Sequence, residues 1–169
     1  DEWYEAFFDT PGRFAMDFTP EYALLPDAGH QHIKRLSERQ KVVFLMREPV
    51  ERASSAIRYF CKQRGCDVTT MSDEEIFDIA RKPFIASMSR YDKTLSTLAR
   101  HYDDENLLFL FYENMMADKA GTLDTVCDWL GIERLDLPAD QLERRDNPTE
   151  AHLLPTPVIE ELRRKLSPV

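Results

Sequence analysis

An arginine and a serine eight residues apart, Arg47 and Ser55, could hold one phosphate group between them. A guanidinium donates two parallel hydrogen bonds to phosphate oxygens, and a serine hydroxyl supplies a further donor. Arg47 could equally form a surface ion pair with Glu48 or Glu51, an interaction that contributes little to stability. The residue types therefore leave two interpretations open, an anion site and a surface salt bridge.

The segments around this pair predict a buried strand that leads directly into a helix. Val42–Met46 is a short apolar run rich in β-forming residues, and the arginine follows it at once. Pro49 suits the first turn of a helix, where its missing N–H costs nothing, and Gly65 suits the helix end after Gln63. Such a junction would bring the two candidate ligands to one edge of a sheet.

A second buried strand and several helices complete an α/β pattern. Leu107–Phe111 is apolar throughout, and segments with helical spacing separate it from Val42–Met46. This order predicts that the two strands are parallel in one sheet, with the helix Pro49–Gln63 packed on it. Further helices are expected at Gln31–Arg39, at Asp73–Arg81 after Ser72 as N-cap, at Tyr91–His101, in the apolar repeat before Gly131 and in the segment with Ile159, Leu162 and Leu166.

Composition excludes several functional classes. At 169 residues with 43% hydrophobic residues, the chain is expected to form a single domain over residues 1–169. A net charge of −9 argues against a nucleic-acid partner, and no apolar run approaches the ~18 residues of a membrane span. We therefore expect neither nucleic acid nor a membrane as a partner of this segment.

Histidines and cysteines form no pattern typical of a metal site. His30 and His32 have no third ligand at a diagnostic spacing, so we expect ordinary surface histidines and no bound metal. Three cysteines cannot all pair, which favours a reducing compartment and a cytoplasmic location. Cys61 and Cys66 could nevertheless form a disulfide in an oxidising compartment.

Three ordered segments resemble sulfotransferases that use 3′-phosphoadenosine 5′-phosphosulfate (PAPS). In the 3′-phosphate-binding motif of that family, an arginine at a strand end is followed by proline two positions on and by serine eight positions on. Arg47, Pro49 and Ser55 match this motif. Asp17–Tyr22 (DFTPEY) is similar to the (Gly/Met)-Glu-Lys-(Ser/Thr)-Pro-x-Tyr segment of the heparan-sulfate-type and bacterial branches. Tyr91–Gly131 resembles the family's later helix, strand, Tyr-Glu turn and final helix.

The resemblance implies a P-loop-like α/β fold of three layers, in which helices flank a parallel sheet. It also implies in-line transfer of a sulfonate group from PAPS to a hydroxyl or amine of a small-molecule or carbohydrate acceptor, without a metal ion. Arg47 and Ser55 would bind the far 3′-phosphate of PAPS, or of the product adenosine 3′,5′-bisphosphate (PAP).

Four more residues are candidates because of their positions in these segments. Asp17 could orient the acceptor hydroxyl or take its proton, unless it is a turn residue that bonds to Thr19. Arg144 and Arg145 lie where related enzymes often close a basic loop over the cofactor, although a solvated charge cluster explains them as well. Glu113 follows the second strand at the edge where such sheets bind ligands, and helix initiation is its simpler role.

Two departures from the family pattern concern catalysis. The glycines form neither G-x-G-x-x-G nor G-x-x-x-x-G-K-[ST], so we expect the family's first strand and phosphosulfate-binding loop upstream of Asp1, in a longer enzyme. Phe18 stands where the family often has lysine. Each missing electrostatic donor is worth roughly 3 to 4 kcal/mol, so turnover by residues 1–169 alone is expected to be undetectable.

Two other functional classes are open. A non-catalytic domain that binds 3′-phosphoadenosine nucleotides, or an interaction domain, would show the same Arg47 and Ser55. A P-loop kinase should carry a metal-binding acidic residue at a strand end, but the two strands here are followed by Arg47 and Tyr112. A membrane anchor upstream of Asp1 would place the enzyme in the Golgi lumen instead of the cytoplasm.

Overall fold

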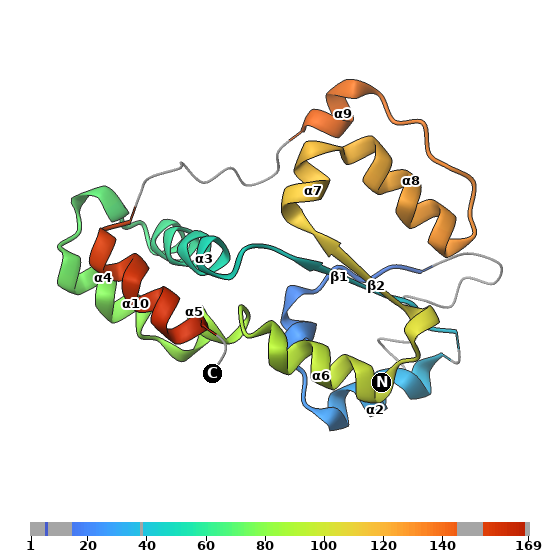
Figure 1. Cartoon of the computed structure of the whole chain (residues 1–169), viewed down its shortest axis with the longest axis horizontal. Helices are drawn as coiled ribbons and strands as arrows, with labels where there is room; N and C mark the ends of the chain where they lie inside the picture. Colours follow the sequence, from blue (N-terminus) through green and yellow to red (C-terminus); the bar gives the residue numbers. More distant parts are fainter. Residues whose placement is uncertain (1–5, 7–14, 38, 145–153, 168–169) are drawn as a thin grey trace.

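Two parallel strands lie at the centre of the chain (Figure 1). The structure, a computed structural model, describes residues 6, 15–37, 39–144 and 154–167. Strands β1 (Val42–Met46) and β2 (Leu107–Phe111) pair in parallel, with each residue of β1 opposite the residue 65 positions later, from Val42 and Leu107 onward. The predicted parallel pairing is therefore confirmed.

Helices lie on both faces of this sheet (Figure 1). Helices α2 (Asp27–Leu36) and α6 (Tyr91–His101) are on one face, and α7 (Tyr112–Ala117) and α8 (Lys119–Leu130) are on the other. Leu98 of α6 is buried in an apolar cluster that includes residues of both strands. The predicted α/β arrangement of three layers is confirmed.

A second group of helices lies beside the sheet rather than on it (Figure 1). The group consists of α3 (Pro49–Gln63), α4 (Asp73–Ala80), α5 (Pro83–Ser87) and α10 (Thr156–Leu166). Ile57, Val158 and Leu162 are fully buried in the apolar cluster that these helices share. We expected α3 to pack on the sheet, but α3 continues away from β1 and its apolar side is covered by the other helices of this group.

Local signals set the helix ends as predicted. Ser72 and Glu75 form a capping box at the start of α4, in which each side chain accepts a hydrogen bond from the other residue's backbone N–H. Helix α8 ends at Gly131, whose φ of +72° is readily adopted only by glycine.

No helix in the described part of the chain is both long and apolar enough to cross a membrane. The short helices are η1 (Pro20–Leu24), η2 (Val68–Thr70), η3 (Asp104–Asn106) and α9 (Ala139–Glu143).

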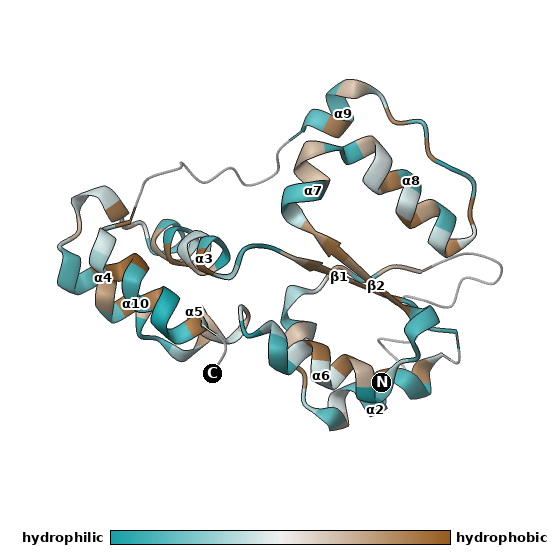
Figure 2. Cartoon of the chain, in the orientation of Figure 1, coloured by the Kyte–Doolittle hydropathy of each residue, from teal (hydrophilic) through white to brown (hydrophobic). Residues whose placement is uncertain are grey.

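The strands are strongly hydrophobic along their length (Figure 2). Part of their side-chain surface nevertheless stays exposed. Val43 and Leu45 of β1 are 43% and 42% exposed, and Phe111 of β2 is 52% exposed. Parallel strands are usually covered on both faces. The residues that the structure describes therefore cover this sheet only in part.

Candidate functional site

Arg47 lies at the carboxyl end of β1, as predicted, and contacts three other side chains. Its backbone N–H donates a hydrogen bond to the Tyr91 hydroxyl at 3.1 Å. The Cζ atom of its guanidinium lies 4.8 Å from the centre of the Tyr112 ring, a cation–π contact. Nη2 is 3.4 Å from the Glu51 carboxylate, and the Arg47 side chain remains 28% exposed. The guanidinium is thus held in place while part of it stays open to solvent.

The ion pair between Arg47 and Glu51 is the surface salt bridge that the sequence left open. The Glu51 side chain is 58% exposed. Exposed pairs of this kind typically contribute about 0 to 1 kcal/mol, because water and salt screen the charges. A phosphate group could therefore replace the carboxylate at the guanidinium at little cost.

Glu48, the other predicted ion-pair partner, caps α3 instead. Its carboxylate accepts hydrogen bonds from the N–H groups of Val50 at 3.2 Å and Glu51 at 2.7 Å. Free N–H groups at a helix N-terminus can bind anions, but these two are already used. An anion near Arg47 would consequently be bound by side chains rather than by the start of α3.

Ser55 lies on α3 one helical turn after Glu51, so both residues are on the same side of the helix. Glu51 contacts the Arg47 guanidinium, which places Arg47 and Ser55 on this common side. Ser55 is half-buried. Arg47 and Ser55 therefore lie on the same side of the first turns of α3, and their joint binding of one phosphate stays a prediction.

Asp17 lies just before η1 and is exposed. Its carboxylate accepts hydrogen bonds from the hydroxyls of Thr19 at 2.6 Å and Tyr22 at 2.5 Å. The turn contact with Thr19 is thus present, and it fixes the direction of the carboxylate. Phe18 is 84% exposed, so it neither contributes to the core nor supplies the cation that the family often has here.

The first turns of α6 connect the Asp17 segment with Arg47. The Thr94 hydroxyl donates to the carbonyl of Ala23, in η1, at 3.0 Å. Tyr91, one turn earlier on α6, contacts the backbone of Arg47. The segment that begins at Asp17 is therefore anchored to the same end of α6 as the β1 carboxyl end.

Arg52 lies beside this junction, and we did not identify it from the sequence. Its guanidinium is half-buried, and Nη2 lies 2.9 Å from the Met88 sulfur. Burial lowers the pKa of Arg52, whereas the charges of Tyr91 and Glu21 raise it. The available signal was the second arginine, five residues after the first.

The structure does not bring Arg144 to the anion site. Arg144 directly follows α9, and Lys119 ties α9 to the start of α8 through the Leu142 carbonyl at 2.8 Å and the Glu143 carboxylate at 2.9 Å. Figure 1 shows α9 beside α7 and α8 and apart from α3. Arg145 lies outside the described residues, so the basic loop over the cofactor stays a prediction.

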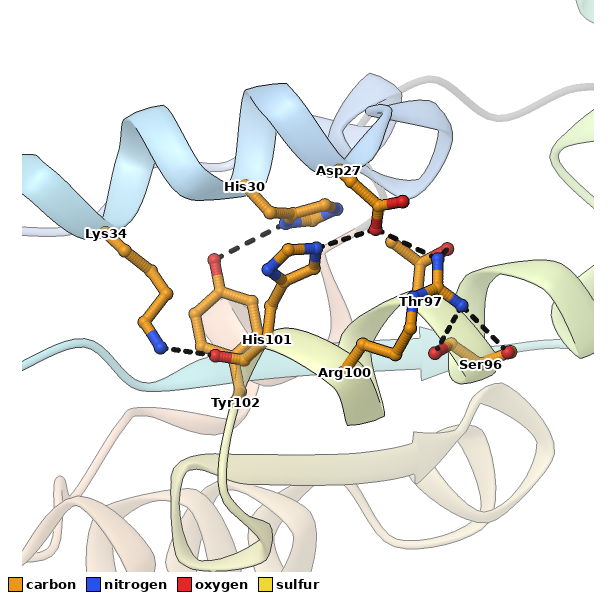
Figure 3. Close-up of polar contacts among 8 residues, drawn as sticks. All are labelled: Asp27, His30, Lys34, Ser96, Thr97, Arg100, His101 and Tyr102. Carbon is orange, nitrogen blue, oxygen red and sulfur yellow. Dashed lines mark hydrogen bonds and ion pairs between the residues drawn. The ribbon is translucent and has the colours of Figure 1, made fainter.

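A second polar cluster lies at the opposite end of α6, roughly 15 Å along the helix axis from Tyr91 (Figure 3). His30 is only 4% exposed, which corrects the expectation of a surface histidine. Its ring stacks on that of His101, with centres 5.4 Å apart, and Nδ1 lies 3.4 Å from the Tyr102 hydroxyl. The Asp27 carboxylate lies 2.7 Å from His101 Nε2.

This cluster attaches α2 to α6. Arg100 donates a further hydrogen bond to the Asp27 carboxylate, and Lys34 donates one to the His101 carbonyl. No group of at least three potential metal ligands occurs within the part of the chain that the structure describes. The cluster is therefore a structural contact distant from Arg47.

We expect acid to weaken this attachment. Burial, and to a lesser extent the charge of His101, lower the pKa of His30, whereas Asp27 raises it. The folded state therefore favours neutral His30. The contribution of His30 to the free energy of unfolding is complete above about pH 6.5, its pKa in the unfolded chain, and is lost as the pH falls below that value. Urea midpoints measured from about pH 8 to pH 5 should decline. In the His30→Phe variant, the urea midpoint should decline less over this pH range than in the parent protein. An equal decline in both proteins would contradict this role of His30.

Comparison with known proteins places the chain among sulfotransferases. The profile of the sulfotransferase family matches residues 6–136. Human heparan sulfate glucosamine 3-O-sulfotransferase 3B1 is 29% identical over 129 residues, which cover 73% of this chain and 33% of that protein. The mouse protein of the same name is 27% identical over 128 residues, which cover 73% of this chain and 33% of that protein. The chain thus spans about a third of the length of these relatives.

Solved structures share the fold. A sulfotransferase from Alicyclobacillus acidocaldarius superposes with a TM-score of 0.61 at 17% identity, covering 86% of this chain and 57% of that one. The sulfotransferase domain from the curacin biosynthetic pathway superposes with a TM-score of 0.55 at 15% identity, covering 92% of this chain and 63% of that one. These likenesses confirm the P-loop-like sulfotransferase fold. Because the family profile also matches most of its length, the chain belongs to the sulfotransferase family.

Proposed function

We propose that the protein binds the 3′-phosphate of PAPS through Arg47 and Ser55 and transfers the sulfonate group to an acceptor hydroxyl. The observation that carries the proposal is the position of the Arg47 guanidinium, at the carboxyl end of β1 and on the side of α3 that bears Ser55. Ligands of α/β folds bind at this end of the strands. Membership of the family supports PAPS as the donor.

The donor set fits a phosphate. A partly exposed guanidinium, paired only weakly with Glu51, can offer two donors, and a serine hydroxyl can add one. When bound, PAPS supplies the sulfonate group for in-line transfer. Arg47 and Ser55 hold the end of the donor far from that group, and so fix its register. Arg144 and Arg145 are proposed as further contacts to the donor, at a part of the nucleotide other than the 3′-phosphate, because α9 lies apart from α3.

Asp17 is the proposed base. The hydroxyls of Thr19 and Tyr22 hold its carboxylate, and an ionised carboxylate can accept about four hydrogen bonds. Asp17 would take the proton of the acceptor hydroxyl as its oxygen bonds to the sulfur and the bond from sulfur to the 5′-phosphate oxygen breaks, with PAP as the leaving group.

The acceptor is proposed to be a carbohydrate. The human and mouse relatives are named as heparan sulfate glucosamine 3-O-sulfotransferases, and they support a sugar hydroxyl over an amine.

Cys61, Cys66 and Cys127 are free thiols, which supports the cytoplasm over the Golgi lumen as the proposed location.

Nucleotide discrimination tests the donor assignment. Calorimetry should show that PAP binds about 30 to 1,000 times more tightly than adenosine 5′-monophosphate, because the charged contact between Arg47 and the 3′-phosphate contributes about 2 to 4 kcal/mol. Equal affinities for the two nucleotides would overturn the proposal.

A non-catalytic nucleotide-binding domain is the second candidate. The exposed Phe18, at a position where the family often has lysine, favours it. Transfer of labelled sulfonate from PAPS to a panel of sugar and small-molecule acceptors separates the two functions. Binding of PAP without transfer by the whole protein would support the second.

A further inference from the structure

Side chains from two other elements hold the turn between β1 and α3. The N–H of Arg47 donates to the hydroxyl of Tyr91 on α6 at 3.1 Å. The N–H of the next residue, Glu48, donates to Oε1 of Glu113 on α7 at 2.9 Å. Two consecutive peptide groups are therefore each bound by a side chain that lies 44 and 65 residues away in the sequence.

Tyr91 and the residue before Glu113 make further contacts at this end of β1. The Tyr91 ring makes an edge contact with Phe44 of β1, with centres 5.7 Å apart and planes at 81°. Glu113 directly follows Tyr112, whose ring contacts the Arg47 guanidinium. One pair of neighbouring residues on α7 thus contacts the side chain of Arg47 and the peptide group of Glu48. Helix initiation, the simpler role expected for Glu113, does not account for this contact.

The contact with Glu48 also reaches α3. The N–H of Glu48 is bound by Glu113, while the Glu48 carboxylate caps the first turn of α3. The position of α3, and of Ser55 two turns along it, is therefore linked to α7 through one residue. The hydrogen bond from Glu48 is also the main reason that the pKa of Glu113 is lowered, so its carboxylate is a charged acceptor at neutral pH.

The direction of the guanidinium depends on this turn. The β1–β2 ladder ends at Met46, so no strand pairing fixes the peptide groups of Arg47 and Glu48. A ligand group displaced by about 1 Å can lose most of its contribution to binding or catalysis. Contacts that fix these two peptide groups consequently set where the guanidinium can meet a phosphate.

We propose that Tyr91 and Glu113 are positioning residues that fix the Arg47–Glu48 turn and thereby aim the Arg47 guanidinium at the 3′-phosphate. The inference rests on the proposed function for its ligand. It assigns no contact with the nucleotide to either residue.

The ratio of PAP to adenosine 5′-monophosphate affinity tests this role. Glu113→Ala should reduce the ratio about tenfold, since one charge-assisted hydrogen bond is lost. Glu113→Gln keeps an acceptor oxygen and should retain most of the ratio, and Tyr91→Phe should lower it about threefold as a neutral bond is lost. Glu160→Ala, at an exposed position on α10, is the matched control and should leave the ratio unchanged. A general loss of stability would instead lower both affinities together, and that result would overturn the inference.

Amide NMR of the protein without nucleotide gives an independent readout. The Glu48 amide proton should shift as Glu113 titrates below its ordinary pKa, and this shift should vanish in Glu113→Gln. A Glu48 amide that does not respond would overturn the inference even if PAP binds. Equal binding of the two nucleotides by the parent, with a responsive amide, would overturn the proposed function and leave the held turn supported.

Discussion

Replacing Arg47 with alanine is expected to weaken binding of PAP by about 2 to 4 kcal/mol. The guanidinium lies against the Tyr112 ring and its side chain is 28% exposed, so water screens its charge-assisted hydrogen bonds to a phosphate only in part. The substitution also leaves the phosphate without its bidentate partner. Calorimetry with PAP measures the loss directly.

Two variants sharpen this measurement. Arg47→Lys keeps the charge but not the planar fork, so it should bind with intermediate affinity. Glu51→Gln removes the carboxylate that now pairs with the guanidinium, and PAP affinity should be unchanged or slightly higher, because an exposed pair is worth at most about 1 kcal/mol. An Arg47→Ala protein that binds PAP as well as its parent would refute the anion site, as would equal losses for PAP and adenosine 5′-monophosphate.

Local sequence signals predicted the elements around this site well. Pro49 and Gly65 gave the bounds of α3, and the apolar runs gave both strands and their parallel pairing. Partners across the chain were harder to predict. The spacing of Ala53 and Ile57 indicates a buried side of α3, but any apolar surface could cover it, and α10 supplies that surface some 100 residues later in the chain.

The same limit applies to the site. A strand-end arginine and a serine eight residues on were found from spacing, because both lie in one continuous segment. The contacts of Tyr91 and Glu113 join segments far apart in the sequence, and the residue type alone does not predict which partner each one bonds to. His30 was expected at the surface for a related reason. Its burial depends on stacking with His101 and on an α2 that begins at Asp27, four residues earlier than the predicted start.

Replacing Asp17 with asparagine is expected to lower kcat by about two to four orders of magnitude, the usual contribution of a general base. Asparagine has nearly the same size, and its carbonyl oxygen can still accept a hydrogen bond from Thr19, but it cannot take a proton. PAP affinity should be unchanged, since Asp17 is assigned to the acceptor rather than to the donor. Sulfonate transfer by the whole protein, together with PAP calorimetry, measures both quantities.

Tyr22→Phe separates chemistry from turn structure. It removes the hydroxyl that donates to Asp17 at 2.5 Å but leaves the carboxylate able to accept a proton, so kcat should fall far less than in Asp17→Asn. If Asp17 is only a turn residue, the two variants should instead show similar small losses, in line with one hydrogen bond of about 1 kcal/mol each. An Asp17→Asn enzyme with parental kcat would then require another base, because a hydroxyl that bonds to the sulfonate must still lose its proton.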